Sequence, residues 1–275
     1  MKIKDARSLS PTAQEALRMR AVNAVIQGKK RSEVAKLFGG APIAPEVVRC
    51  IMRIFRCDYI QTYGMTETSP YLTLSVLQDH LKKLPPEEQF RYKAKTGRAF
   101  ITVDLKVVRD DGSEVEPDEK EAGEILVKGE TVTPGYWNLP EETKKAFDSG
   151  WFKTGDLAVI DREGYVNIVD RKKDMIISGG ENIFSIEVEN VLYQHPKALE
   201  AAVFGTPDEI WGEIVTAAVT VKPEMILTHE ELINFCAGKL AAFKIPRRIF
   251  FIEKLPKTGS GKIFKRRLKE MFSGV

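Results

Sequence analysis

The sequence predicts a mixed α/β (α+β) protein made of two packed units in series. β-prone and helical stretches alternate along most of its 275 residues, and 43% hydrophobic with 29% charged residues is typical of a globular chain. A polar run, Asp170 to Asp174, separates a predicted hairpin from the apolar residues Met175 to Ile177. Such a run is expected at a joint between two packed units.

Length and charge set the outer limits. The chain is long enough for one large or two ordinary domains, and a net charge of +3 does not by itself imply a polyanionic partner. No apolar run approaches the roughly 18 residues that a membrane span needs, and Met1 is not followed by an apolar signal segment. We therefore expect a cytoplasmic protein.

Cysteines and histidines do not suggest a metal site. The cysteines form an odd set without metal-ligand spacing, which favours buried free thiols: Cys50, Cys57 and Cys236. The histidines lie on polar stretches, where surface positions are expected: His80, His195 and His229.

Residues 1–38 are strongly basic, with a net charge of about +6. Ser10-Pro11-Thr12 predicts the start of an amphipathic helix that ends at Gly28, and Ser32 starts a second short helix. The pair resembles the opening of a helix-turn-helix unit of the transposase or repressor kind, although the chain turns to GGAP where the recognition helix would follow. The alternative is a basic helical arm with a solvated face.

Residues 39–170 predict a helix followed by short strands. A helix after Pro45 carries an apolar face, and a strand from Asp58 to Thr62 follows it. We expect a solvated helix and loop over 77–94, strands over 101–108 and 123–127, and one or two helical turns over 141–147. Strands 157–160 and 165–169 form a hairpin whose turn needs a positive φ at Gly164.

Residues 171–275 predict a compact small domain. Beyond the polar joint, the pattern gives helices over 183–192, 232–240 and 263–271, with strands over 199–204, 214–221 and 248–252.

Several motifs occur together in one order. They are YGMTET at Tyr63–Thr68, GYW with PEET within Gly135–Thr143, KTGD at Lys153–Asp156, the run Trp151–Glu189 and PKTGSGK at Pro256–Lys262. Together they resemble the adenylate-forming (AMP-binding) superfamily, of the acyl-CoA synthetase or fatty-acid–CoA ligase type, over Gly39 to Lys269. The resemblance implies that 39–170 is the C-terminal part of the large AMP-binding domain, including a β-subdomain, and that 171–275 is its small C-terminal lid domain.

The resemblance also implies a nucleotide site. Gly40 and Ala41 pass the adenine ring, where small residues allow a close backbone approach. Gln61 lies near the adenine, and Tyr63 stacks on it. The Asp156 carboxylate accepts hydrogen bonds from the ribose hydroxyls, with Arg171 as an additional donor. The alternatives from the residues alone are an ordinary strand-to-loop turn with a buried tyrosine, and simple Gly-Asp turn chemistry.

Catalytic roles are implied in the same way. Thr66 reaches the phosphate, and Glu67 helps to hold Mg²⁺. Lys262 neutralises the charge that develops during adenylation. Lys173 is the hinge, and Gly180 lines the channel for the CoA thiol. A phosphate-binding P-loop is excluded at Lys262 because Ile263 follows it. A solvated basic tail describes the residues after Lys262 better than it describes Lys262 itself.

The motifs imply the C-terminal half of an ATP-dependent acyl-CoA synthetase, with ATP, Mg²⁺ and CoA as its cofactors and co-substrates and a fatty acid as the expected acid. The family's phosphate loop, of the form TSGTTGxPK, does not occur in the sequence. Two alternatives follow: a catalytically inactive remnant whose basic arm serves as a binding module, or one piece of a split enzyme that needs a complementing chain. A DNA-binding fragment is a third hypothesis.

Overall fold

The computed structural model describes residues 45–258 and 262–272. These residues divide into two compact units between Val169 and Asp170, beside the predicted polar joint. The expected helices over 1–38 and the predicted adenine segment at Gly40 and Ala41 lie outside the described residues. Among those described, no helix is long and apolar enough to span a membrane.

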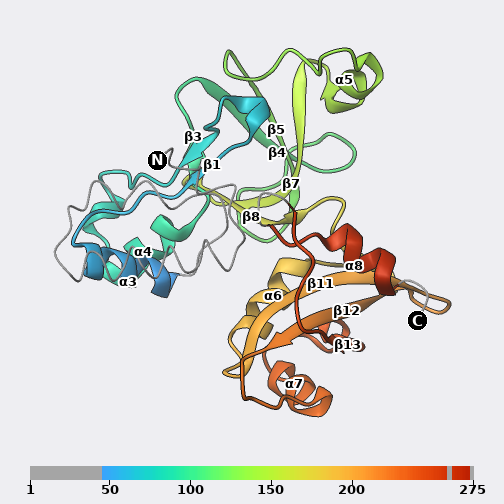
Figure 1. The fold of residues 1–275 in the computed structure, drawn as a ribbon. Helices are drawn as coiled ribbons and strands as arrows, with labels where there is room; N and C mark the ends of the chain where they lie inside the picture. Colours follow the sequence, from blue (N-terminus) through green and yellow to red (C-terminus); the bar gives the residue numbers. More distant parts are fainter. Residues whose placement is uncertain (1–44, 259–261, 273–275) are drawn as a thin grey trace, which may run out of the picture. The chain divides into compact units, whose positions relative to one another are not determined.

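The N-terminal unit begins with two helices that pack together, α3 (Pro45–Phe55) and α4 (Pro86–Ala94), which lie side by side in Figure 1. Phe55 on α3 is buried, in agreement with the predicted apolar face. A short 3-10 helix, η4 (Leu81–Lys83), precedes α4. The prediction of a solvated segment over 77–94 is wrong for Leu77 and Leu81, which are buried in a cluster with Tyr165.

A three-stranded antiparallel sheet follows in the order β1-β2-β3. The predicted strand from Asp58 to Thr62 is mostly absent, because β1 contains only Thr62 and Tyr63. The other two strands are β2 (Thr73–Leu74) and β3 (Arg98–Ala99).

The second sheet of this unit is the predicted β-subdomain. Its order is β4-β5-β7-β6, with β8 paired to β7. Gly164 in the β7–β8 turn has φ +77°, as the hairpin prediction requires. The helix α5 (Pro140–Ala146) matches the predicted helical turns. The strands are β4 (Val103–Val108), β5 (Gly123–Gly129), β6 (Phe147–Asp148), β7 (Trp151–Ile160) and β8 (Val166–Arg171).

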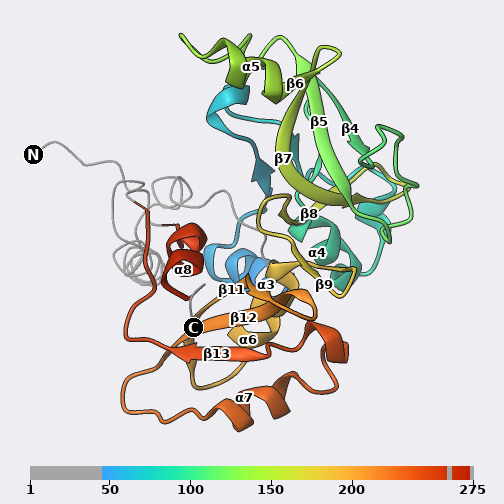
Figure 2. The same cartoon turned by 90° about the vertical axis from the view of Figure 1, so that its right-hand side faces the viewer.

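The C-terminal unit is built on a five-stranded sheet of order β10-β9-β12-β11, in which β13 pairs parallel to β12. Figure 2 shows β13 alongside β12. The predicted strands are all present, whereas β10 was not predicted. The strands are β9 (Ile176–Ser178), β10 (Glu181–Ile183), β11 (Ala198–Asp208), β12 (Gly212–Val221) and β13 (Arg248–Phe251).

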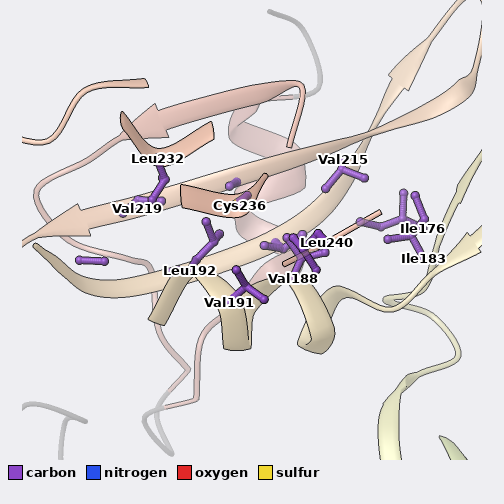
Figure 3. Packing of buried hydrophobic residues seen from close by; sticks show 14 of the residues in the cluster. Ile176, Ile183, Val188, Val191, Leu192, Val215, Val219, Leu232, Cys236 and Leu240 are labelled. Atoms are coloured by element: carbon purple, nitrogen blue, oxygen red, sulfur yellow. The ribbon is translucent and has the colours of Figure 1, made fainter. Parts of the chain in front are cut away.

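Helices cover both faces of this sheet, because alternate residues of a strand point to opposite sides. Ala201 and Val203 of β11 pack into the larger core with Val188, Val191 and Leu192 of α6, as Figure 3 shows for the α6 side chains. Ala202 and Phe204 pack on the other face with Leu268 of α8. The helices are α6 (Ser185–Tyr193), α7 (His229–Cys236) and α8 (Lys265–Phe272), with the 3-10 turn η5 (Ala242–Lys244).

The predicted solvent exposure of one cysteine and one histidine is wrong. Cys57 is exposed, not buried, whereas Cys236 is buried as predicted. His195 is only 4% exposed and packs edge-to-face against Phe235, with a ring separation of 4.7 Å. Burial lowers the pKa of His195 from its ordinary value.

Candidate active site

Asp156 lies at a bulge in the middle of β7, not in the simple Gly-Asp turn that was the alternative from the sequence. Glu124 and Leu126 of β5 pair with Leu157 and Lys153 respectively, so the β7 residues 154–156 stand opposite Ile125 alone. Gly155 supplies the required positive φ, +72°. The extra residues turn the Asp156 carboxylate out of the regular alternation of the strand.

Hydrogen bonds hold the bulge in place. The Thr154 hydroxyl donates to the Ile125 carbonyl at 2.9 Å and accepts from the Asp156 backbone N–H at 3.1 Å. The Gly155 N–H donates to Glu124 Oε1 at 3.2 Å. Thr154 and Glu124 therefore position Asp156. They were not predicted as site residues, although Thr154 belongs to the KTGD motif.

Tyr63 and Asp156, 93 positions apart in the chain, meet in the N-terminal unit. The Tyr63 hydroxyl donates to Asp156 Oδ2 at 2.6 Å, and both residues are buried. A donor at this distance from an ionised carboxylate forms a charge-assisted hydrogen bond, which is stronger than a neutral one. Two residues that the resemblance assigns to the nucleotide thus form one contact.

The segment after Tyr63 folds back on itself at Gly64. A Cβ at Gly64 would lie 1.5 Å from the Pro70 carbonyl oxygen, so only glycine allows this close approach. Thr66–Thr68 then forms the 3-10 helix η3, in which the Thr68 hydroxyl accepts from the Met65 N–H at 3.1 Å. The turn presents Thr66 at the surface and leaves Glu67 half-buried.

Glu67 is held from the GYW motif. The Tyr136 hydroxyl donates to Glu67 Oε1 at 3.3 Å, and the Thr133 N–H donates to the Glu67 carbonyl at 2.7 Å. Burial, and then the Glu67 carboxylate, raise the pKa of Tyr136. Tyr136 was not singled out from the sequence, but its motif was.

Gln61 is buried behind the turn. Its side-chain oxygen accepts from the Tyr59 hydroxyl, and its backbone N–H donates to the Ser75 hydroxyl at 2.6 Å. Gln61 thus lies two positions before Tyr63, and its side chain has Tyr59 as a protein partner.

The donor set around Glu67 suits a metal that is held largely by phosphate. In the parts of the chain that the structure describes, no group of three histidine, cysteine, aspartate or glutamate side chains could bind a metal by itself. Mg²⁺ in nucleotide sites takes one or two carboxylates together with phosphate oxygens and water. A single carboxylate at Glu67 fits that pattern only when a nucleotide supplies the rest.

The remaining predicted residues lie in the C-terminal unit. Arg171, the last residue of β8, and Lys173, in the turn that follows, are both exposed. The Arg171 N–H donates to Asp170 Oδ1 at 2.7 Å. Lys262 is exposed and directly precedes Ile263, which forms a short antiparallel bridge with Lys257.

Gly179 and Gly180 form the two-residue turn between β9 and β10, with φ +60° and +85°. Positive φ at both central positions is the geometry of a type I′ hairpin. A Cβ at Gly180 would meet no atom within 4 Å, whereas one at Gly179 would lie 2.7 Å from Cε3 of Trp211.

A hollow of about 320 Å³ opens beside this turn. The Arg247 guanidinium lies 4.3 Å from the centre of the Trp211 ring, within the range of a cation–π contact. Sequence reasoning missed Trp211 and Arg247, because nothing in their local pattern distinguishes them from surface residues. The lining residues are Ser178, Gly179, Glu181, Trp211, Ala242, Phe243 and Arg247.

Solved structures identify the class of protein. The fold is similar to that of o-succinylbenzoate CoA synthetase (MenE) from Bacillus subtilis in complex with the acyl-adenylate intermediate, with a TM-score of 0.73 and 35% identity over 84% of this chain and 45% of that one. It is equally similar to ATP-bound MatB from Rhodopseudomonas palustris, with a TM-score of 0.73 and 33% identity over 86% and 44% of the two chains. Both matches show an adenylate-forming enzyme fold.

Family models give the same assignment. Residues 7–137 match the model described as AMP-binding enzyme, and residues 187–262 match the AMP-binding enzyme C-terminal domain. The chain belongs to the AMP-binding, adenylate-forming enzyme family. The first match begins at residue 7, so the family likeness extends further toward the N-terminus than the Gly39 predicted from the motifs.

Curated relatives are CoA ligases for different acids. The chain is 40% identical to long-chain-fatty-acid–CoA ligase FadD13 of Mycobacterium tuberculosis over 86% of its own length and 44% of that protein. It is 38% identical to the peroxisomal benzoate–CoA ligase of Arabidopsis thaliana over 92% and 46%. It is 37% identical to the 2-succinylbenzoate–CoA ligase of Listeria monocytogenes over 86% and 46%. The chain spans about half the length of these relatives.

Proposed function

We propose that the chain takes part in ATP-dependent activation of a carboxylic acid, followed by transfer of the acyl group to the thiol of CoA. The observation that supports this most directly is the hydrogen bond between Tyr63 and Asp156, which joins two motif residues in a buried site. The chain covers only 44% of the length of FadD13, so the complete two-step reaction is itself proposed.

The nucleotide would be bound by groups from several motifs. Asp156, held at the bulge and by Tyr63, offers carboxylate oxygens to the ribose hydroxyls. We assign the Tyr63 ring, Gln61 and the backbone at Gly40 and Ala41 to the adenine, and Arg171 as a further donor to the nucleotide.

In the first step, a carboxylate oxygen of the acid forms a bond to the α-phosphorus, and the bond to pyrophosphate breaks. Negative charge builds on the equatorial oxygens, and the exposed ammonium of Lys262 neutralises it. Thr66 offers its hydroxyl to the phosphate. Glu67 is the residue that would hold Mg²⁺, which when bound would supply further charge neutralisation.

In the second step, the CoA thiolate attacks the acyl carbon and AMP leaves. The glycine turn offers a backbone approach without side chains at Gly180, and Lys173 in the exposed turn is the proposed hinge. The hollow beside the turn offers aromatic faces and the Arg247 cation, which suit the adenine and phosphates of CoA.

A fatty acid is the proposed acid, and FadD13, a long-chain-fatty-acid–CoA ligase, is the relative that favours it. Because the relatives also include benzoate and 2-succinylbenzoate ligases, a panel of these three acid classes is the right substrate test.

ATP–pyrophosphate exchange tests the proposal. The purified chain should exchange label in the presence of one acid class, and Lys262→Ala should lower the rate by about 10²-fold or more, by analogy with the loss of one charge-stabilising group. Lys254→Ala, an exposed lysine in the same region, is the matched control. Exchange that appears only when a second chain is added would support a split enzyme, and no exchange in either case would support the non-catalytic binding module.

A further inference from the structure

The segment that carries Lys262 is closed at its base. The Thr258 N–H donates to the Lys262 carbonyl at 2.8 Å, and the Phe264 N–H donates to the Pro256 carbonyl at 2.9 Å. The Lys262 N–H donates to the Thr258 hydroxyl at 3.2 Å. The two arms, 256–258 and 262–264, therefore pair with each other as in a short hairpin, and the position of Lys262 depends on how this base is fixed.

Lys257 fixes the first arm. Its ammonium lies 2.5 Å from Glu200 Oε1, and the two side chains are 8% and 29% exposed. Glu200 belongs to β11, which pairs with β12 and packs against helices on both faces. An ion pair this well shielded is screened much less than a pair in open solvent.

Lys265 fixes the second arm at the start of α8. Its ammonium lies 2.8 Å from Glu189 Oε1, and both side chains are 14% exposed. The same carboxylate oxygen accepts from the Val203 N–H of β11 at 2.8 Å. Burial raises the pKa of Glu189, and the Lys265 ammonium opposes that shift.

The Lys265 contact continues toward the joint. The Lys265 ammonium also donates to the Ser185 hydroxyl at 2.5 Å, and that hydroxyl donates to Asp170 Oδ1 at 3.0 Å. Asp170 is 1% exposed and is the first residue of the C-terminal unit after Val169. One chain of polar contacts thus joins the start of this unit to the base of the Lys262 segment.

We propose that Lys257 and Lys265 are positioning residues, which hold the two arms of the Lys262 segment on β11 through Glu200 and Glu189. The proposal rests on the proposed function for the role of Lys262, but not for the contacts themselves. Breaking a shielded pair leaves one charge without its partner, so the loss should exceed that of a surface pair. Loosening the base should spread Lys262 over several positions and lower the fraction of productive encounters.

Amide hydrogen exchange tests the positioning without any need for activity. In Lys265→Met, the amides of Thr258 and Phe264 should exchange at least about tenfold faster than in the unmodified chain. In Lys265→Arg, which keeps the charge, the same amides should exchange as slowly as in the unmodified chain. The matched control is Arg266→Met, because Arg266 on the same helix pairs with the exposed Glu270. Unchanged exchange in Lys265→Met would overturn the proposal. So would an equal acceleration of every amide in the unit, because that is general destabilisation.

Pyrophosphate exchange provides the functional measurement on the same variants. Lys257→Met and Lys265→Met should each lower kcat about tenfold and leave the KM for ATP within about twofold of that of the unmodified chain. Lys257→Arg and Lys265→Arg should have a kcat close to that of the unmodified chain. An active unmodified chain whose kcat does not change in these variants would overturn the proposal. An inactive unmodified chain would instead count against the proposed function, and the amide measurement would then decide the proposal on the Lys262 segment by itself.

Discussion

The glycine turn between β9 and β10 allows a prediction with a built-in control. Alanine at either Gly179 or Gly180 must adopt a positive φ, which costs about 1–2 kcal/mol. Only at Gly179 does the new Cβ also collide, 2.7 Å from Cε3 and 2.9 Å from Cζ3 of Trp211. Carbon atoms normally approach to about 3.5–4.0 Å, so the indole would have to move by roughly 1 Å.

The backbone of Trp211 is held close to Gly179, so the indole can relieve this clash only by leaving its position against Arg247. The Gly179 N–H donates to the Trp211 carbonyl at 2.9 Å, and the backbone N–H of Trp211 donates to Asp208 Oδ1 at 3.0 Å. Overpacking of this kind costs about 1–3 kcal/mol. We therefore expect Gly180→Ala to lower the free energy of unfolding by about 1–2 kcal/mol and Gly179→Ala by about 2–5 kcal/mol.

Native-state hydrogen exchange of the β12 amides is the suitable assay, because it reports the C-terminal unit separately in a chain with two units. Equal losses in the two alanine variants, within about 0.5 kcal/mol, would refute the assigned contact between Gly179 and Trp211.

Two further predictions concern a hydrogen bond and a buried histidine. Tyr63→Phe removes the donor to the buried Asp156 carboxylate, so the affinity for AMP should fall about tenfold in calorimetry, and the free energy of unfolding should fall by about 1.5–3 kcal/mol in denaturation. The control is Tyr71→Phe at a half-exposed position, which should change neither quantity. Equal effects of the two substitutions would contradict the hydrogen bond. Because burial lowers the pKa of His195, protonation of this imidazole is less favourable in the folded state than in the unfolded state. The contribution of neutral His195 to the free energy of unfolding is complete above the ordinary pKa of about 6.5 and should be lost as pH falls through the lower pKa of the folded state. Denaturation between about pH 7 and pH 5 should show this loss, and His195→Asn should reduce it; an identical slope in both proteins would count against the assignment.

The sequence predicts the main elements of the fold because their signals are local. The hairpin around Gly164 and the helix of Phe55 follow from turn chemistry and from periodicity, and both are present. The strand β10 was missed because Glu181 to Ile183 is too short to show alternation. It forms because the two glycines before it make a tight turn that pairs it with β9.

Burial was predicted less well, because it depends on distant partners. His195 lies on a polar stretch, yet Phe235 from α7 covers its ring. Cys57 follows an apolar helix, yet it lies beyond the last helical residue, Phe55, and is exposed. Neither outcome can be read from neighbours in the chain, because each depends on tertiary packing.

For the candidate site, the motifs identify residues but not their arrangement. That Tyr63 binds Asp156 depends on a bulge whose register involves Glu124 and Leu126 of another strand. The contacts of Lys265 likewise join residues from three separate elements. Such long-range contacts are set by the topology of the sheets, which no local pattern specifies.

Calorimetric titration of AMP into the purified chain tests the central claim most directly, because Asp156 and Tyr63 are proposed to hold the nucleotide within a single unit. We predict saturable binding of one AMP per chain, weakened at least about tenfold in Asp156→Ala, since a ribose bound by a carboxylate loses charge-assisted hydrogen bonds worth about 1.5–3 kcal/mol. Binding of equal strength in the unmodified chain and in Asp156→Ala would contradict the account, as would the absence of binding to the unmodified chain.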